Sequence, residues 1–340
     1  MIQHLRNRQF RRRGGFVFVT LVVGFALTLS ACKGDQQKPA SSQAANSAPA
    51  VAAPNPADFD PPANAPAAPK VDGKRAIQYA QEIVNFGPRP IGSETHRKVE
   101  DYIKSKLQGL QIEEDKFTAN TTAGNFPLNN IVAKIPGKKD GIIILASHYD
   151  TNYPLRDENF VGANDGAATS ALLIEMANQL KSKVNDGYSI WFLFTDGEEA
   201  TVNWSAQDSL YGTKHLAKKW QQDGTAAKIK AFILLDMIGD KDLDVDKDGN
   251  STPWLQEVIG RAAERTGNKK YFYNSEQAMD DDHLPFKDIN VPVVDLIDFT
   301  YGFNNLYHHT TEDKMDKISA NSLQVVGDTV LESIRALNTK

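Results

Sequence analysis

Cysteine is almost absent from this chain: Cys32 is the only one among its 340 residues. A single cysteine cannot form an intramolecular disulfide, so this chain must be stabilised by an apolar core instead. Metal sites built from several cysteines are excluded for the same reason. Any metal ion would have to be bound by the nitrogen and oxygen ligands of His, Asp and Glu.

The chain also lacks a surplus of positive charge outside its first residues. The formal net charge is −5, and residues 1–31 hold five arginines and no acidic residue. The rest of the chain has 33 basic against 43 acidic residues. A balance of this sign argues against a nucleic acid as the partner.

The N-terminus has the pattern of a targeting segment. Arginines precede the apolar run 16–31, and the sequence Leu-Ser-Ala-Cys ends at Cys32. This arrangement resembles the bacterial lipoprotein signal, which predicts a signal peptide over residues 1–31 and a lipid on Cys32. An uncleaved signal anchor is the alternative. Lys33 follows the cysteine, where an aspartate would suggest inner-membrane retention. We therefore expect a lipid-anchored protein of the cell envelope, on the outer-membrane or periplasmic side, that contacts the membrane only through its lipid.

Residues 32–72 are rich in Ala, Pro, Ser, Gln and Asn and have almost nothing to bury. This composition predicts a disordered tether. The folded domain is expected to span residues 73–340, and the acidic surface of one domain favours a monomer.

Apolar runs alternate with helical patterns through this domain. Strands are predicted over 112–118, 130–135, 142–147, 190–194, 231–235 and 291–296, and helices over 74–86, 95–110, 167–180, 209–220, 253–266 and 320–337. Strands that alternate with helices predict a three-layer α/β/α sandwich with a mixed, largely parallel central sheet.

Acidic and imidazole side chains follow several of these strands. The run Tyr188–Thr195 ends in Asp196-Gly-Glu198-Glu199, and similar groups follow the other strands. They include His148, Asp150, Asp165, Asp236, Asp281 and His309. In open α/β sheets the ligand site lies beyond the carboxyl ends of the strands, so these groups are expected to converge. Their repulsion is relieved most simply by a divalent cation, and this donor set fits catalytic zinc.

Five motifs resemble those of a known family. HYD, GANDG, DGEE, LLDMIG and HHTTED occur in the order and spacing of the zinc aminopeptidase superfamily M28, over residues 75–338. Within it, Asp196–Ala217 and the DDHLPF segment Asp281–Phe286 are similar to the glutaminyl-peptide cyclotransferase branch.

The resemblance implies one zinc ion and an assignment of roles. Asp165, Glu199 and His309 would bind zinc, Glu198 would be the general acid/base, Asp236 and Asp281 would form a carboxylate network, and Trp204 would line the substrate pocket. The implied reaction converts the N-terminal Gln of peptides or proteins to pyroglutamate and releases ammonia.

Two positions depart from the animal members of that branch. His308 stands where they have tryptophan, and Asp295 stands where they have histidine in the PVxxLI segment. His308 leaves open which of the adjacent histidines binds metal. We assign His309, since the superfamily ligand directly precedes Thr-x-x-Asp, and place His308 in the pocket wall.

Two other functions remain open at this stage. In a two-zinc aminopeptidase, His148 and Asp236 would bind a second zinc, Asp165 would bridge the two ions, and Glu198 would activate water. A non-catalytic, surface-anchored binding protein would be expected to have lost Glu198, which is present.

A further motif lies outside the family pattern. Asp244, Asp246 and Asp248, followed by Gly249, match the first half of a calcium loop. The twelfth position is Leu255 instead of a bidentate glutamate, so a solvated acidic turn is the alternative to Ca²⁺ binding.

Overall fold

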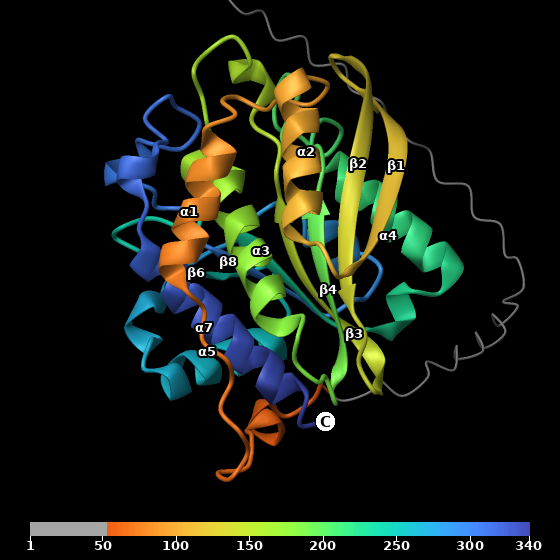
Figure 1. Cartoon of the computed structure of the whole chain (residues 1–340), viewed down its shortest axis with the longest axis vertical. Helices are drawn as coiled ribbons and strands as arrows, with labels where there is room; N and C mark the ends of the chain where they lie inside the picture. Colours follow the sequence, from red (N-terminus) through yellow and green to blue (C-terminus); the bar gives the residue numbers. More distant parts are fainter. Residues whose placement is uncertain (1–52) are drawn as a thin grey trace, which may run out of the picture. The chain divides into compact units, whose positions relative to one another are not determined.

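The computed structural model describes residues 53–340. The strands are β1 Gln111–Thr121, β2 Gly124–Ile135, β3 Lys139–His148, β4 Tyr188–Thr195, β5 Ile229–Asp236, β6 Val245–Asp248, β7 Phe272–Gln277 and β8 Val293–Ile297. The helices are α1 Gly73–Val84, α2 Glu94–Lys106, α3 Thr169–Leu180, α4 Tyr211–Asp223, α5 Pro253–Thr266, α6 Leu284–Lys287 and α7 Ala320–Leu337 (Figure 1). None of the helices in residues 53–340 has the length and apolar character needed to span a bilayer.

The main sheet has six strands in the order β1-β2-β4-β3-β5-β8. β1/β2 and β2/β4 pair antiparallel, whereas β3/β4, β3/β5 and β5/β8 pair parallel. The predicted mixed, largely parallel sheet is confirmed. The small parallel sheet of β6 and β7 was not predicted, because VDKD and FYNSEQ lack the apolar run of a buried strand.

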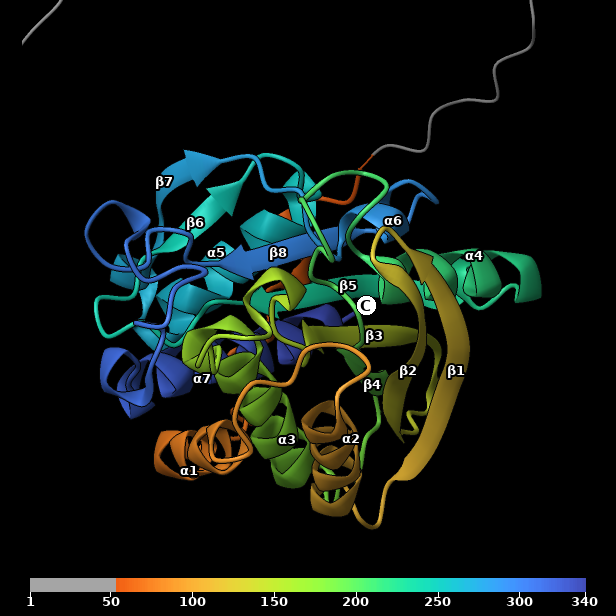
Figure 2. The ribbon, with the colours of Figure 1, turned by 90° about the horizontal axis from the view of Figure 1, so that it is seen from above.

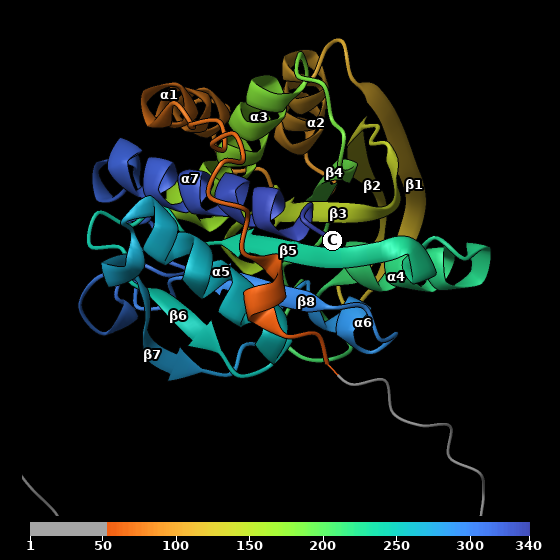
Figure 3. The ribbon, with the colours of Figure 1, turned by 90° about the horizontal axis from the view of Figure 1, so that it is seen from below.

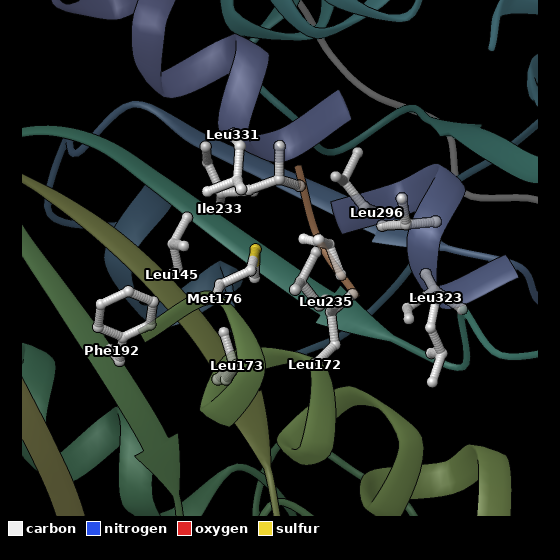
Figure 4. Packing of buried hydrophobic residues seen from close by; sticks show 14 of the residues in the cluster. Leu145, Leu172, Leu173, Met176, Phe192, Ile233, Leu235, Leu296, Leu323 and Leu331 are labelled. Carbon is white, nitrogen blue, oxygen red and sulfur yellow. The ribbon is translucent and has the colours of Figure 1, made fainter. Parts of the chain in front are cut away.

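Helices cover both faces of the main sheet. Figures 2 and 3 show α1, α2 and α3 grouped together, with α4 and α6 in a separate group. Strand residues alternate between two apolar clusters: Ile143 and Leu145 belong to the larger cluster, and Ile144 and Ala146 to the smaller one. Figure 4 shows side chains of the larger cluster packed together, including Met176 of α3 and Leu331 of α7. These two packed faces fix the strands whose ends form the site described below.

The segment before α1 is packed onto the domain. Phe59 is buried and stacks on Trp254 with ring centroids 5.3 Å apart, and Val71 is 3% exposed. The backbone N–H of Val71 donates to Asp328 over 2.9 Å. Phe59 and Val71, which the sequence places in the predicted tether, therefore pack against the domain that is predicted to begin at residue 73. Single apolar anchors in an Ala/Pro-rich segment produce no periodicity that a sequence pattern could reveal.

Three predictions concern residues outside the described range. The signal peptide over residues 1–31, the lipid on Cys32 and the first part of the tether, residues 32–52, all precede residue 53.

Candidate active site

Three parallel strands end at the same edge of the sheet. β3 ends at His148, β4 is followed by Asp196–Glu199, and β5 ends at Asp236. Parallel strands point the same way, so their carboxyl ends lie side by side. The structure brings these groups together on one rim, and the loops containing Asp165 and His309 complete it.

Asp165, Glu199 and His309 form the first cluster on this rim. His309 Nε2 lies 3.4 Å from Asp165 Oδ2 and 3.1 Å from Glu199 Oε1. Asp165 Oδ2 is buried and accepts no hydrogen bond. Two ligands held about 2.1 Å from a zinc ion at the tetrahedral angle are about 3.4 Å apart, so these separations suit one shared cation. The donor set of two carboxylates and one imidazole fits zinc.

Hydrogen bonds from neighbouring groups position the ligands. The backbone N–H of Asp165 donates to Asp313 Oδ2 over 3.1 Å, and that of Asn164 donates to Asp313 Oδ1 over 2.8 Å. Asn152 Nδ2 donates to Glu199 Oε2 over 2.8 Å. The backbone at Asp165 is thus fixed, and Glu199 Oε1 is left to face His309.

His308 and His309 differ in their contacts. The two rings stack with centroids 3.9 Å apart, and both have nitrogens close enough to Asp165 to share one ion with it. His309 Nε2 also faces Glu199, whereas His308 packs edge-on against Phe299 and lines the cavity. This geometry favours His309 as the ligand and His308 as the wall.

A second cluster lies beside the first and shares Asp165. His148 Nε2 is 3.1 Å from Asp165 Oδ1 and 3.3 Å from Asp236 Oδ1. His148 is 2% exposed, and neither its ring nitrogens nor Asp236 Oδ1 has a hydrogen-bond partner. The ligands expected for a second ion therefore also converge, and the geometry alone does not exclude a two-metal centre.

Glu198 adjoins both clusters and is 7% exposed. Burial raises the pKa of its carboxyl well above the usual range; His148 acts against this, and Glu199 and Asp281 add to it. Burial and then Asp236 likewise raise the pKa of Asp281, whose Oδ2 accepts no hydrogen bond. A general acid/base works best when its pKa lies close to the working pH, and burial shifts the pKa of both carboxyl groups in that direction.

A cavity of about 380 Å³ opens over these groups. Residues of both clusters line this cavity. Trp204, which is 42% exposed, also lines it. Other lining residues are Met237, Met279, Ile297, Phe299 and His308. A cavity lined by a few polar groups together with apolar side chains is typical of a site for a small organic group.

The calcium-loop motif has a different conformation from the one predicted. Residues 245–248 form strand β6, so the alternate aspartates lie along an extended chain and do not converge on one point. Asp246 is fully buried and accepts hydrogen bonds from Ser275, Gln277 and the backbone of Phe299. The metal-capable groups found among residues 53–340 include neither Asp244 nor Asp246.

Sequence reasoning missed two residues that support the rim, Asn152 and Arg89. Arg89 is fully buried, and its guanidinium donates to the carbonyl oxygens of Tyr149, Gly162 and Asp165 over 2.6, 3.0 and 3.1 Å. Arg89 therefore links the end of β3 to the loop that contains Asp165, and it brings a positive charge close to the buried carboxylates. The sequence Arg-Pro after a helix stop looks like a surface loop and gives no signal of this role.

Comparison with known proteins adds sequence and structural relatives. The sequence model of peptidase family M28 matches residues 130–334. The chain is 33% identical over 237 residues to the glutaminyl-peptide cyclotransferase of Drosophila melanogaster, covering 62% of this chain and 67% of that protein.

Two solved structures are similar over most of their length. The glutaminyl cyclase of an Acidobacteriales bacterium is 52% identical with a TM-score of 0.79, covering 82% of this chain and 98% of that one. A leucine aminopeptidase precursor from Bacteroides thetaiotaomicron is 25% identical with a TM-score of 0.71, covering 79% and 98%.

Proposed function

This chain belongs to peptidase family M28 and, within it, to the glutaminyl-peptide cyclotransferases, and from that premise we propose how it works. It converts the N-terminal glutamine of peptides to pyroglutamate and releases ammonia. Asp165, Glu199 and His309 would hold one metal ion that assists the reaction. The observation on which this rests is the spacing of those three side chains beside Glu198, at the floor of an open cavity.

The bound glutamine must present its α-amine and its γ-carboxamide to the same few atoms. A zinc ion held by the three ligands would polarise the carboxamide carbonyl. Glu198 accepts a proton as the α-amine nitrogen bonds to the carboxamide carbon, and returns it as the carbon–nitrogen bond breaks and ammonia leaves. Because nucleophile and electrophile belong to one residue, the cavity contributes mainly by holding the attacking conformation.

Asp236 and Asp281 are proposed to act through Glu198. Both line the cavity, and each has a buried oxygen with no hydrogen-bond partner. They would orient Glu198 and keep its proton near the reacting atoms. Trp204 and His308 would exclude water from the polarised carbonyl, so that cyclisation is favoured over hydrolysis.

The second candidate function is a two-metal aminopeptidase. The convergence of His148, Asp165 and Asp236 favours it, since those side chains could hold another ion. In that mechanism Glu198 would act on water instead of the substrate amine.

A product assay separates the two functions. The purified protein is incubated with a peptide that begins with glutamine, and ammonia and peptide mass are followed. Cyclisation releases ammonia and lowers the peptide mass by that amount, whereas hydrolysis releases free glutamine. A matched peptide with an acetylated N-terminus lacks the nucleophilic amine and should not react. Release of free glutamine as the main product would overturn the cyclase proposal.

The cellular placement is proposed from the sequence. Cleavage before Cys32 and acylation of that residue would anchor the domain to the cell envelope, with the outer membrane favoured. Replacement of Cys32 by serine should move the protein from the membrane fraction to the soluble fraction. We also propose a monomer whose substrates are peptide or protein N-termini. Calcium is left out of the proposal, since the Asp246 oxygens already accept hydrogen bonds.

A further inference from the structure

A second hollow, with a volume of about 520 Å³, adjoins the cavity over Glu198. It is lined by residues of α4 and α6, which Figures 2 and 3 show side by side, and we call it the side groove. Trp204 and Asp280 line both the side groove and the cavity, so the two share a wall. The hollows beside α2 and beside residues 183–187 share no lining residue with the cavity.

A peptide substrate must lead out of the cavity. The α-amine and the γ-carboxamide of its first residue both have to reach the rim, so the residues that follow lie outside. An extended chain advances about 3.3–3.6 Å per residue, so residues two to four cover about 10 Å of the surface next to the cavity. The side groove begins at that surface, because Trp204 and Asp280 belong to both linings.

Much of the lining of the side groove is apolar. Leu210 and Ala217 are 5% and 3% exposed, and Leu284, Pro285 and Ile289 line the groove with them. Side chains of a bound peptide would remove this apolar surface from water, which favours binding. A concave, partly apolar surface that continues from a reaction site suits the rest of the same substrate.

The side groove also has charged groups of both signs. Lys214 and Lys218 are four residues apart on α4, so they lie on one face of that helix. Lys214 Nζ donates to the carbonyl oxygens of Ala206 and Ser209 over 2.8 and 2.7 Å, and it is thereby engaged by the loop. Within residues 53–340, neither Lys218 nor Asp288, just after α6, has an ion-pair partner. One positive and one negative group are therefore available to a ligand.

We propose that the side groove binds residues two to four of the peptide, downstream of the glutamine that cyclises. This subsite rests on the proposed function, and it would make the enzyme selective for peptides over short glutamine derivatives. Contacts remote from the reacting atoms would hold the glutamine in its attacking conformation. An acidic side chain would pair with Lys218 and a basic one with Asp288. Both pairs would be exposed and weak, so chain length affects turnover more than sequence does.

Chain length tests the side groove. The value of kcat/KM is compared for a glutaminyl dipeptide amide and for a pentapeptide amide that begins with the same two residues and has leucine third. We expect the longer peptide to be favoured about tenfold, as burial of one apolar side chain would allow. Loss of the starting peptide gives this length ratio whichever product forms, whereas ammonia release reports on cyclisation, so the two proposals fail separately. Equal values for both peptides would overturn the subsite.

A bulky substitution locates the additional binding. Ala206 is exposed and lines the side groove, so Ala206→Trp would fill part of it and the length ratio should fall toward one. Ala227→Trp is the matched control, because Ala227 is also exposed and lines neither the groove nor the cavity. A length ratio that stays at the wild-type value in folded Ala206→Trp would overturn the proposal, since the peptide would then leave the cavity by another route.

A charge substitution gives a second reading if Ala206→Trp fails to fold. Two pentapeptides are compared that differ only in glutamate or glutamine at positions three and four. Lys218→Gln should lower the ratio of their kcat/KM values by about 2–5-fold. Gln222→Glu makes the same change in net charge on α4 outside the groove and should leave that ratio unchanged. A ratio that Lys218→Gln does not alter would contradict the placement of the peptide beside α4.

Discussion

Buried aspartates are found both in the loop after β4 and on the rim formed by the carboxyl ends of the parallel strands, but their hydrogen bonding differs. Asp208 is 3% exposed, and its two oxygens accept five hydrogen bonds of 2.6–3.0 Å. The donors are the N–H groups of Thr201, Val202 and Asn203 and the hydroxyls of Thr201 and Tyr211. Despite burial, these bonds hold the pKa of Asp208 below its usual range.

On the rim the same residue type is left with free oxygens. Asp165, Asp236 and Asp281 are each at most 9% exposed, and each has one buried oxygen without a partner. A saturated carboxylate holds a loop in place, whereas an unsaturated one remains available to a metal ion or a proton. The number of hydrogen bonds that a carboxylate accepts therefore distinguishes the structural aspartate from those available for chemistry. Burial does not distinguish them, because both kinds are buried, and the local sequence does not distinguish them either.

The strongest test of this distinction is Glu198→Gln. The change removes a proton carrier while keeping the side-chain shape, so kcat should fall by about 10²–10⁴-fold or more. Metal content should not change, since the metal is assigned to other side chains. Turnover of the glutamine peptide and zinc per chain are measured together. Loss of zinc in this variant would reverse the roles assigned to Glu198 and Glu199.

Glu199→Gln is the matched counterpart one residue away. The Glu199 carboxylate lies 3.1 Å from His309 Nε2. Glutamine has a neutral amide in place of this carboxylate, so the substitution removes a charged candidate ligand. We expect zinc affinity to fall by about 10–100-fold or more, with activity partly restored by excess zinc. Equilibrium dialysis against a zinc buffer measures this. A variant that keeps its zinc but cannot be rescued would show that Glu199 acts on the substrate.

Asp208→Asn tests the structural side of the comparison. In the variant, an amide NH₂ group would replace an oxygen that accepts hydrogen bonds from backbone N–H groups, so a donor would face other donors. We expect the free energy of unfolding to fall by about 1–3 kcal/mol. Since the loop contains Trp204, KM should rise a few-fold while kcat and zinc content stay near wild type. Urea unfolding and steady-state kinetics check both parts. A large fall in kcat at normal KM would place Asp208 among the reactive groups.

Much of this arrangement could be predicted from the sequence. Long apolar runs at 142–147, 190–194 and 231–235 are strands, and α5 and α7 have the predicted bounds of 253–266 and 320–337. The convergence of His148, Glu199 and Asp236 follows from a general property of parallel strands, so it needed only the correct assignment of those strands.

The remainder depends on contacts that no local pattern records. β6 and β7 are polar segments that pair because β6 packs beside β8, and Arg89 reaches across the chain to bind carbonyl groups. Asp248 looked like part of a calcium loop, whereas its partner His283 is distant in sequence. Whether a carboxylate is saturated is likewise a property of the folded neighbours.

Asp298 sharpens the comparison with the smallest expected effect on turnover. Its two oxygens accept only the N–H groups of Asp244 and Thr300, over 2.8 and 3.2 Å, and burial raises its pKa to about 7. The folded state therefore binds the proton more tightly than the unfolded state does, and the contribution of Asp298 to stability is lost as pH rises from about 4 to about 7.

Asp298→Asn cannot ionise, so its free energy of unfolding should rise relative to wild type across that range. One pKa unit is about 1.4 kcal/mol, which limits the gain to about 4 kcal/mol. Urea unfolding at pH 4.5 and pH 8 measures the difference, with activity near wild type. A difference that does not change with pH would show that two hydrogen bonds already suffice to keep a buried aspartate ionised.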